Sequence, residues 1–181
     1  MDFALSDEQT AIFDMAKSFG AHHIAPFAQQ WDKDGSIPKT LWHDIAELGF
    51  GGLYVCEENG GTGLSRLDAT LVFEALSASC ASVAAFLSIH NMCAKMIDSY
   101  GSDDLKSRVL APAIRMDTLL SYCLTEPGAG SDAASLKTRA RPTDDGYHLT
   151  GTKSFISGGG YSDAYIVMAR SGADGPKGIS A

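Results

Sequence analysis

The residues best suited to holding a ligand lie in one short stretch, residues 122–132. Here Thr125 offers a hydroxyl and Glu126 a carboxylate, and Gly128 and Gly130 flank a single alanine. Glycine has no Cβ atom, so a ligand can approach the backbone closely at these two positions. Free N–H groups in such a loop can also form a concave nest for an anion. The composition therefore indicates a ligand-binding loop, whereas a simple connection needs only turn residues.

Other residues with chemical potential carry weaker signals. Gly60–Gly63 has the glycine content of a phosphate loop, but no Lys-Ser or Lys-Thr pair follows it and no parallel-strand pattern precedes it. We interpret it as a turn that leads into the next helix. Glu57, Glu58 and Glu74 belong to no motif, and the histidines, cysteines and carboxylates do not show the spacing of metal ligands.

Helical periodicity dominates up to about residue 117. Ser6 and Gln9 form the pattern of a capping box, which predicts where the first helix begins. Pro26 should interrupt that helix, because proline lacks the N–H group that a helix interior needs. Further helices are predicted at residues 39–48, 66–79, 82–100 and 102–116. Together they should form a bundle-like domain.

The helix predicted at residues 82–100 has apolar or small residues on nearly all of its faces and should be buried. Its polar residues Ser88, His90 and Asn91 allow two interpretations. They could lie near a pocket for an acyl chain, or they could form a hydrogen-bonded group in the core. Because buried polar side chains normally find partners, we favour the core interpretation.

After residue 117 the hydrophobic period changes to two, which is typical of strands. Residues 136–142 and 147–150 flank a turn and predict a hairpin, and further strands are predicted at 152–157 and 164–170. We therefore predict an α+β fold, with an all-α helical bundle domain at residues 1–117 and the beginning of an antiparallel β-barrel or sandwich domain at 118–181. So few strands neither close a barrel nor cover a sandwich, so we expect an N-terminal part of a longer protein.

Composition excludes several functional classes. The 181 residues carry a formal net charge of −8 and no run of Lys or Arg, which disfavours binding to nucleic acids and anionic membranes. No stretch approaches the ~18 apolar residues of a membrane span. The four cysteines include no C-x-x-C pair and should be free thiols in a reducing compartment. The acidic N-terminus is typical of neither a signal nor a transit peptide. We expect a cytoplasmic protein, or alternatively one of the mitochondrial matrix after removal of a presequence.

The stretch at residues 122–132 resembles the flavin-binding signature of the acyl-CoA dehydrogenases. Residues 151–158 resemble that family's second flavin contact, and residues 55–65 resemble the loop that links its helices. The resemblance therefore runs from the first helix to Ala181. Within the family, residues 88–94 are similar to the branch that oxidises isobutyryl-CoA. Where many members carry tryptophan this sequence has Phe155.

This resemblance implies FAD as the cofactor and α,β-dehydrogenation of an acyl-CoA thioester as the reaction. The backbone near Tyr122 and Leu124 and the Thr125 hydroxyl would hold the pyrimidine edge of the flavin. Ser131 would lie near the phosphates and would also contact the CoA part of the substrate. The full set of cofactor-binding residues that the resemblance implies is Tyr122, Cys123, Leu124, Thr125, Gly130, Ser131, Phe155, Ile156 and Ser157, with the last three beside the isoalloxazine ring.

The catalytic base of this family is a glutamate from a second helical domain, so the resemblance assigns no catalytic residue to this chain, and Glu126 is not that base. We accordingly expect the isolated chain to bind flavin poorly and not to turn over. The family further implies an acyl-CoA substrate, an electron-transfer flavoprotein as electron acceptor, and a homotetramer. The alternatives are an acyl-CoA oxidase or a flavin monooxygenase on the same scaffold, or a non-catalytic binding protein if 181 residues is the natural length.

Overall fold

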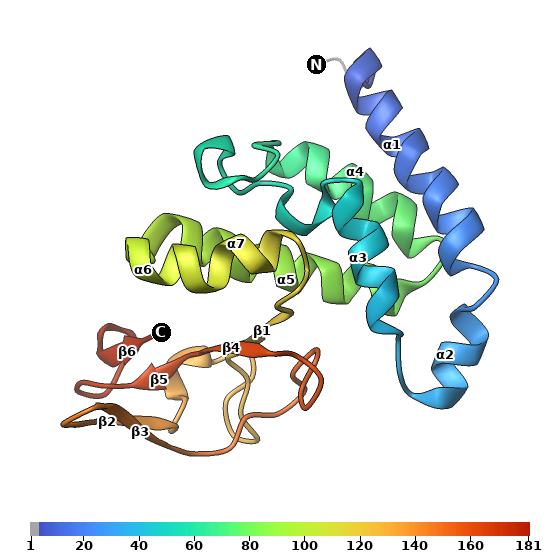
Figure 1. Ribbon diagram of the computed structural model, residues 1–181. Coiled ribbons are helices and arrows are strands. Elements are labelled where there is room, and N and C mark those ends of the chain that lie inside the picture. Colours follow the sequence, from blue (N-terminus) through green and yellow to red (C-terminus); the bar gives the residue numbers. More distant parts are fainter. Residues whose placement is uncertain (1–3) are drawn as a thin grey trace. The chain divides into compact units, whose positions relative to one another are not determined.

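The computed structural model describes residues 4–181 and divides the chain into two compact units. The first unit ends at Thr118 and is helical, and the second comprises Leu119–Ala181 and carries all the strands (Figure 1). The predicted fold class, a helical domain followed by the start of a sheet domain, is therefore confirmed. Among residues 4–181, no helix has both the length and the apolar character that crossing a membrane requires.

The first helix begins where the capping box predicts. In α1 (Asp7–Phe19), the Ser6 hydroxyl accepts a hydrogen bond from the Gln9 N–H at 3.2 Å, and the Gln9 side chain accepts one from the Ser6 N–H at 3.1 Å. A π-helical turn at Gly20–Ile24 follows, and α2 (Ala28–Asp34) begins beyond Pro26. The predicted interruption at this proline is confirmed.

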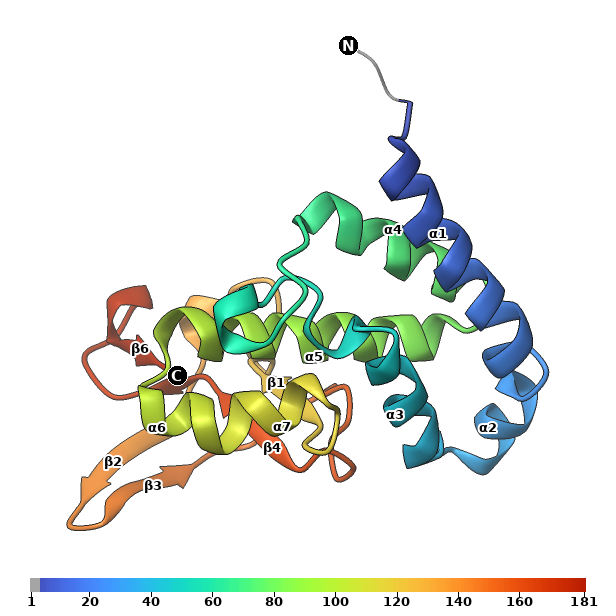
Figure 2. The same cartoon turned by 45° about the horizontal axis from the view of Figure 1, so that its top comes forward.

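The remaining helices follow the predicted order. They are α3 (Lys39–Glu47), α4 (Arg66–Ser77), α5 (Ala81–Tyr100), α6 (Asp103–Leu105) and α7 (Ala111–Ile114). The segment predicted as one helix over 102–116 is divided, because a π-helical turn at Lys106–Leu110 separates α6 from α7. Helix α4 packs between α1 and α5 (Figures 1 and 2).

Two polar side chains of α5 are bonded to segments that lie before and after this helix in the chain. The Asn91 side chain accepts a hydrogen bond from the Leu53 N–H at 2.7 Å and donates to the carbonyls of Phe50 at 2.8 Å and Leu87 at 3.1 Å. The His90 ring lies 3.0 Å from the Ala113 carbonyl. Both side chains are fully buried, which confirms the core interpretation for them.

Residues 50–64 form the loop that the glycine cluster belongs to, and they dock onto α5 through a buried carboxylate. Asp98 accepts hydrogen bonds from the Cys56 thiol at 3.0 Å, from the Asn59 amide at 2.6 Å and from the Lys95 ammonium at 2.6 Å. Burial by itself would raise the pKa of Asp98, but these donors outweigh it and hold the pKa well below its usual range. The glycine-rich turn is therefore fixed to the helical core by protein groups.

The buried His90 makes the helical unit sensitive to mild acid. Burial lowers the pKa of His90 from 6.5 to about 4, although the backbone of Ala113 and Gly51 opposes the shift. As the pH falls, His90 is protonated in the unfolded chain at a higher pH than in the folded chain. The contribution of neutral His90 to folding stability is therefore fully present above pH 6.5 and is lost as the pH falls toward 4. We expect a loss of about 2 kcal/mol between roughly pH 7 and pH 5. Urea unfolding of wild type and His90→Gln at both pH values checks this. An equal pH dependence in the two proteins would show that His90 is not responsible.

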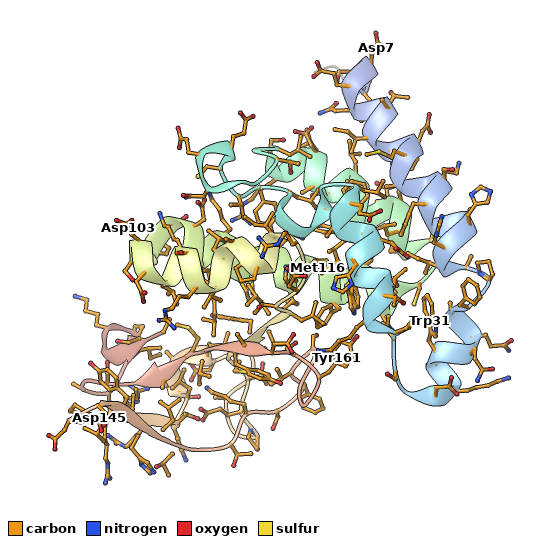
Figure 3. All side chains as sticks on the ribbon, viewed as in Figure 1. Asp7, Trp31, Asp103, Met116, Asp145 and Tyr161 are labelled. Carbon is orange, nitrogen blue, oxygen red and sulfur yellow. The ribbon has the colours of Figure 1, made fainter. Side chains whose placement is uncertain are left out.

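The second unit contains two small sheets. In the first, β1 (Leu120–Cys123) pairs in parallel with β4 (Ala164–Val167). The second has the strand order β3-β2-β5-β6, with bounds Gly146–Thr150, Arg139–Thr143, Ala169–Arg170 and Ile179–Ser180. The pairs β2–β3 and β5–β6 are antiparallel, whereas β2 and β5 meet in parallel. The predicted hairpin is confirmed, and Asp145 lies at its tip (Figure 3).

One predicted strand is wrong. Residues 152–157 pair with no strand in the described part of the chain. The Phe155 backbone has φ +57°, in the left-handed region, and so cannot continue an extended strand. The segment is instead held by separate hydrogen bonds, which include one from the Ser154 N–H to the Thr125 carbonyl at 2.9 Å.

Candidate cofactor site

Strand β1 leads directly into the loop that the sequence singles out. Its residues pair with β4, with Tyr122 opposite Ile166 and Cys123 opposite Val167. The Cys123 side chain is buried, and burial raises the pKa of its thiol even though the Lys153 charge opposes this. Tyr122 and Leu124 are half-buried. The buried Cys123 side chain serves packing, so a ligand at this position would meet the backbone.

The loop after β1 closes on itself and leaves its glycines open. Glu126 and Ala129 exchange both backbone hydrogen bonds, at 3.0 and 3.1 Å. A Cβ atom added at Gly128 or Gly130 would meet nothing within 4 Å. The space beside this backbone is therefore free, as the prediction of a ligand-holding loop requires. Ser131 follows with an exposed side chain.

Glu126 is fully engaged by protein donors. Its carboxylate accepts hydrogen bonds from the N–H groups of Lys137 at 2.6 Å and Thr138 at 2.9 Å, and from the Lys153 ammonium at 2.9 Å. Burial by itself would raise the pKa of Glu126, but the two N–H groups and the Lys153 ammonium outweigh it and lower the pKa from 4.5 to about 2. A carboxylate with so low a pKa is a poor proton acceptor near neutral pH. These hydrogen bonds give Glu126 a structural role, because they tie residues 137, 138 and 153 to the loop.

Residues 152–158 present an aromatic ring beside this loop. Phe155 is 96% exposed and adopts the left-handed backbone conformation, which costs a non-glycine residue about 1 kcal/mol. Ile156 is half-buried and the Ser157 side chain is exposed. Gly158 has φ +79°, a conformation that favours glycine or asparagine. An exposed phenylalanine in a strained turn is unusual for packing and typical of a functional site.

A pair of buried hydroxyl groups holds the turn that contains Phe155. Ser121 on β1 donates to the Ser157 carbonyl at 2.5 Å, and its oxygen lies 2.6 Å from the Ser162 hydroxyl. Ser121 is fully buried. The hydroxyls of Thr125, Ser131 and Ser157, by contrast, make no hydrogen bond within residues 4–181. They remain available to a ligand.

Hydrogen bonds connect the segments of some predicted site residues, whereas other predicted residues are connected to them only along the chain. Thr125 is bonded to Ser154, next to Phe155, whereas within the described chain no hydrogen bond links Gly130 or Ser131 to residues 155–157. Sequence reasoning missed Lys153 and Ser121 as supports of the site. A lysine inside the otherwise apolar and hydroxylated stretch 151–158 was the one available signal for Lys153, because a buried charge needs a partner.

A cationic cavity lies near the loop within the same unit. It has a volume of about 620 Å³, and its lining includes the basic residues Lys137, Arg139 and Arg170. Asp132 and Asp174 contribute carboxylates to its wall. A smaller cavity of about 250 Å³ is lined by Glu126, Gly128 and Thr152 among others. The local basic character contrasts with the net charge of −8 and provides a place for anionic groups.

Comparison with known proteins identifies the family. Residues 6–117 match the family model described as "Acyl-CoA dehydrogenase, N-terminal domain", and residues 121–181 match "Acyl-CoA dehydrogenase, middle domain". The chain is 51% identical to "Isobutyryl-CoA dehydrogenase, mitochondrial" of Dictyostelium discoideum over 97% of its own length and 42% of that relative. It thus spans less than half of this relative.

Two solved structures share the fold. Butyryl-CoA dehydrogenase of Megasphaera elsdenii has a TM-score of 0.85 and 37% identity, with 96% of this chain and 46% of that chain covered. The FAD complex of PigA has a TM-score of 0.90 and 30% identity, with 99% and 48% covered. These matches include both units. The chain belongs to the acyl-CoA dehydrogenase family.

Proposed function

We propose that the protein containing this chain is an FAD-dependent acyl-CoA dehydrogenase that acts on a short branched acyl group such as isobutyryl-CoA. Membership of the family supports the reaction class. The likeness to a relative named isobutyryl-CoA dehydrogenase supports the substrate. The likeness to a structure named as an FAD complex supports the cofactor.

The observation that carries the proposal is the presentation of Phe155. Phe155 is 96% exposed and has a left-handed backbone conformation. The Ser154 N–H next to it is hydrogen-bonded to the Thr125 carbonyl in the loop after β1. A planar aromatic ligand fits such a surface, because offset stacking of rings stabilises a complex by about 0.5–1.5 kcal/mol beyond the area that it buries. The hydroxyls of Thr125 and Ser157 make no hydrogen bond within residues 4–181 and can offer polar contacts to such a ligand. This donor set suits a flavin, which combines a flat ring with a polar edge.

In this proposal the backbone near Tyr122 and Leu124 and the Thr125 hydroxyl hold the pyrimidine edge. Cys123 contributes backbone from a buried position, and Gly130 leaves space for the remainder of the cofactor. Phe155, Ile156 and Ser157 lie along the ring. Bound FAD supplies the acceptor for the hydride that leaves the acyl Cβ atom. The protein's part is to orient the ring and to exclude water around it.

The proposed CoA contacts lie at Ser131 and at the cationic cavity. Ser131 is exposed, and the exposed residues Lys137 and Arg139 line the cavity beside residues 132–137. Positive groups suit the phosphates of CoA. The family further suggests an electron-transfer flavoprotein as acceptor and a homotetramer. The relative's name includes "mitochondrial", which supports the matrix rather than the cytoplasm for this protein.

Phe155 provides a direct test of the cofactor contact. We expect Phe155→Ala to raise the FAD dissociation constant of the whole protein about tenfold, because the stacked face is lost. The free energy of unfolding without FAD should change by less than about 1 kcal/mol, since the ring is exposed. Tyr147→Ala is the matched control, because Tyr147 is another exposed aromatic of this unit. Equal dissociation constants for the two variants would remove Phe155 from the site.

The reaction class is tested by turnover of the whole protein with an artificial electron acceptor. We expect isobutyryl-CoA to be converted to its α,β-unsaturated product faster than straight-chain acyl-CoA esters of similar length. Turnover that needs only oxygen would favour the acyl-CoA oxidase alternative. Absence of turnover with every saturated acyl-CoA ester, in protein shown to contain FAD, would contradict the proposal.

A further inference from the structure

One buried ion pair joins the two segments of the candidate site. The Lys153 ammonium donates to Glu126 Oε1 at 2.9 Å and also to the Leu124 carbonyl at 2.9 Å. The side chains are only 11% and 7% exposed. Glu126 additionally accepts from the N–H groups of Lys137 and Thr138. A single pair of charges therefore gathers residues 124–126, 137–138 and 153.

The position of this pair in the sequence matters for the site. Glu126 is adjacent to Thr125, and Lys153 is two residues before Phe155. Between them the Ser154 N–H donates to the Thr125 carbonyl at 2.9 Å. The links from Lys153 and Ser154 therefore fix three successive residues, Leu124 to Glu126, against the start of the Phe155 turn.

Stability alone is a weak reason for such a pair. Burying two charges is costly, and apolar replacements of a whole buried pair are often neutral or stabilising. Removing only one partner is harmful because the other charge remains buried. Unlike apolar packing, a charged pair imposes directional hydrogen bonds, because the Lys153 ammonium must reach two acceptors at once. An arrangement with strict geometry suits a site that must hold two contacts on one rigid ligand.

We infer that Glu126 and Lys153 are positioning residues for the flavin, and that their ion pair sets the spacing between Thr125 at its edge and Phe155 at its face. This inference rests on the proposed function. It assigns a role to the glutamate of the signature loop that requires no proton transfer. It also assigns a role to Lys153 that requires no direct contact with the cofactor.

The experiment compares Lys153→Met, the double variant Glu126→Gln with Lys153→Met, and Lys177→Met in the whole protein. Lys177 is an exposed lysine of the same unit, its side chain makes no hydrogen bond or ion pair within residues 4–181, and it lines neither cavity, so it is the matched control. Each variant is measured for the thermal midpoint without FAD, the FAD dissociation constant by fluorescence, and the visible spectrum and midpoint potential of the bound flavin.

The single variant should lose thermal stability, and the double variant should recover most of it because no unpaired charge remains. FAD binding should stay about tenfold or more weaker in the double variant, with a changed flavin spectrum, because the lost charge-assisted bonds held the spacing. Lys177→Met should match wild type in all measurements. A double variant that recovers both stability and FAD affinity would show a purely structural role and overturn the inference.

The outcomes also separate this inference from the proposed function. If wild type binds FAD and reduces it with isobutyryl-CoA while the double variant binds FAD as tightly as wild type, only the inference fails. If wild-type protein binds no FAD, the proposed function fails and the inference fails with it.

Discussion

Replacing Arg170 with methionine is expected to destabilise the unit formed by residues 119–181 by roughly 4 kcal/mol. Arg170 is 5% exposed, and its guanidinium donates five hydrogen bonds to four backbone carbonyls. The acceptors are Ala134 and Leu136 on one side and Ala173 and Gly175 on the other. Methionine can fill part of the volume but offers no donor, so these carbonyls would lose their charged partner.

The effect should be local and specific. Hydrogen exchange of the backbone amides at residues 134–139 and 169–180 should accelerate in Arg170→Met, together with a lower urea midpoint. Arg139→Met is the matched control, because Arg139 sits opposite Arg170 in the sheet but has an exposed side chain. Its effect should stay within about 0.5 kcal/mol. If the two variants unfolded at the same urea concentration, the guanidinium would not be the support that we describe.

Replacing Asn91 with leucine is expected to cost the helical unit about 3 kcal/mol. The Asn91 amide joins the Leu53 N–H and the Phe50 carbonyl to α5, at 2.7 and 2.8 Å. Leucine has a similar size and would leave both backbone groups buried without this partner. The penalty for unsatisfied buried groups therefore dominates over any gain in hydrophobic burial.

Denaturant unfolding with hydrogen exchange tests this expectation. The amides of residues 50–55 should lose protection first, because the loop is tied to α5 at this point. Ser88→Ala serves as the control, since the Ser88 hydroxyl donates only to the Ala85 carbonyl one turn earlier. Unchanged protection of residues 50–55 in Asn91→Leu would mean that the loop is held by other contacts.

Local sequence patterns predicted the helical unit well. The capping box at Ser6, the interruption at Pro26 and the burial of α5 each follow from residues close together in sequence, so periodicity and capping chemistry are sufficient. The single helix predicted over residues 102–116 is divided by a π-helical turn. Such a turn changes no residue pattern that periodicity detects.

The geometry of the candidate site could not be predicted from local sequence. The alternation at residues 152–157 favours a strand, and the left-handed conformation of Phe155 is set by tertiary bonds from Ser154 and Ser121 instead. Likewise, the partner of Glu126 lies 27 residues away at Lys153. No local rule reports a contact at that separation. The roles of these residues toward a flavin remain a proposal.

The most direct test is the anaerobic visible spectrum of the whole protein, loaded with FAD and then mixed with isobutyryl-CoA. We expect a bound-flavin spectrum whose visible band bleaches on addition of the substrate and stays bleached until an electron acceptor is added. Bound flavin that no saturated acyl-CoA ester bleaches, or failure of the whole protein to bind FAD, would contradict this expectation.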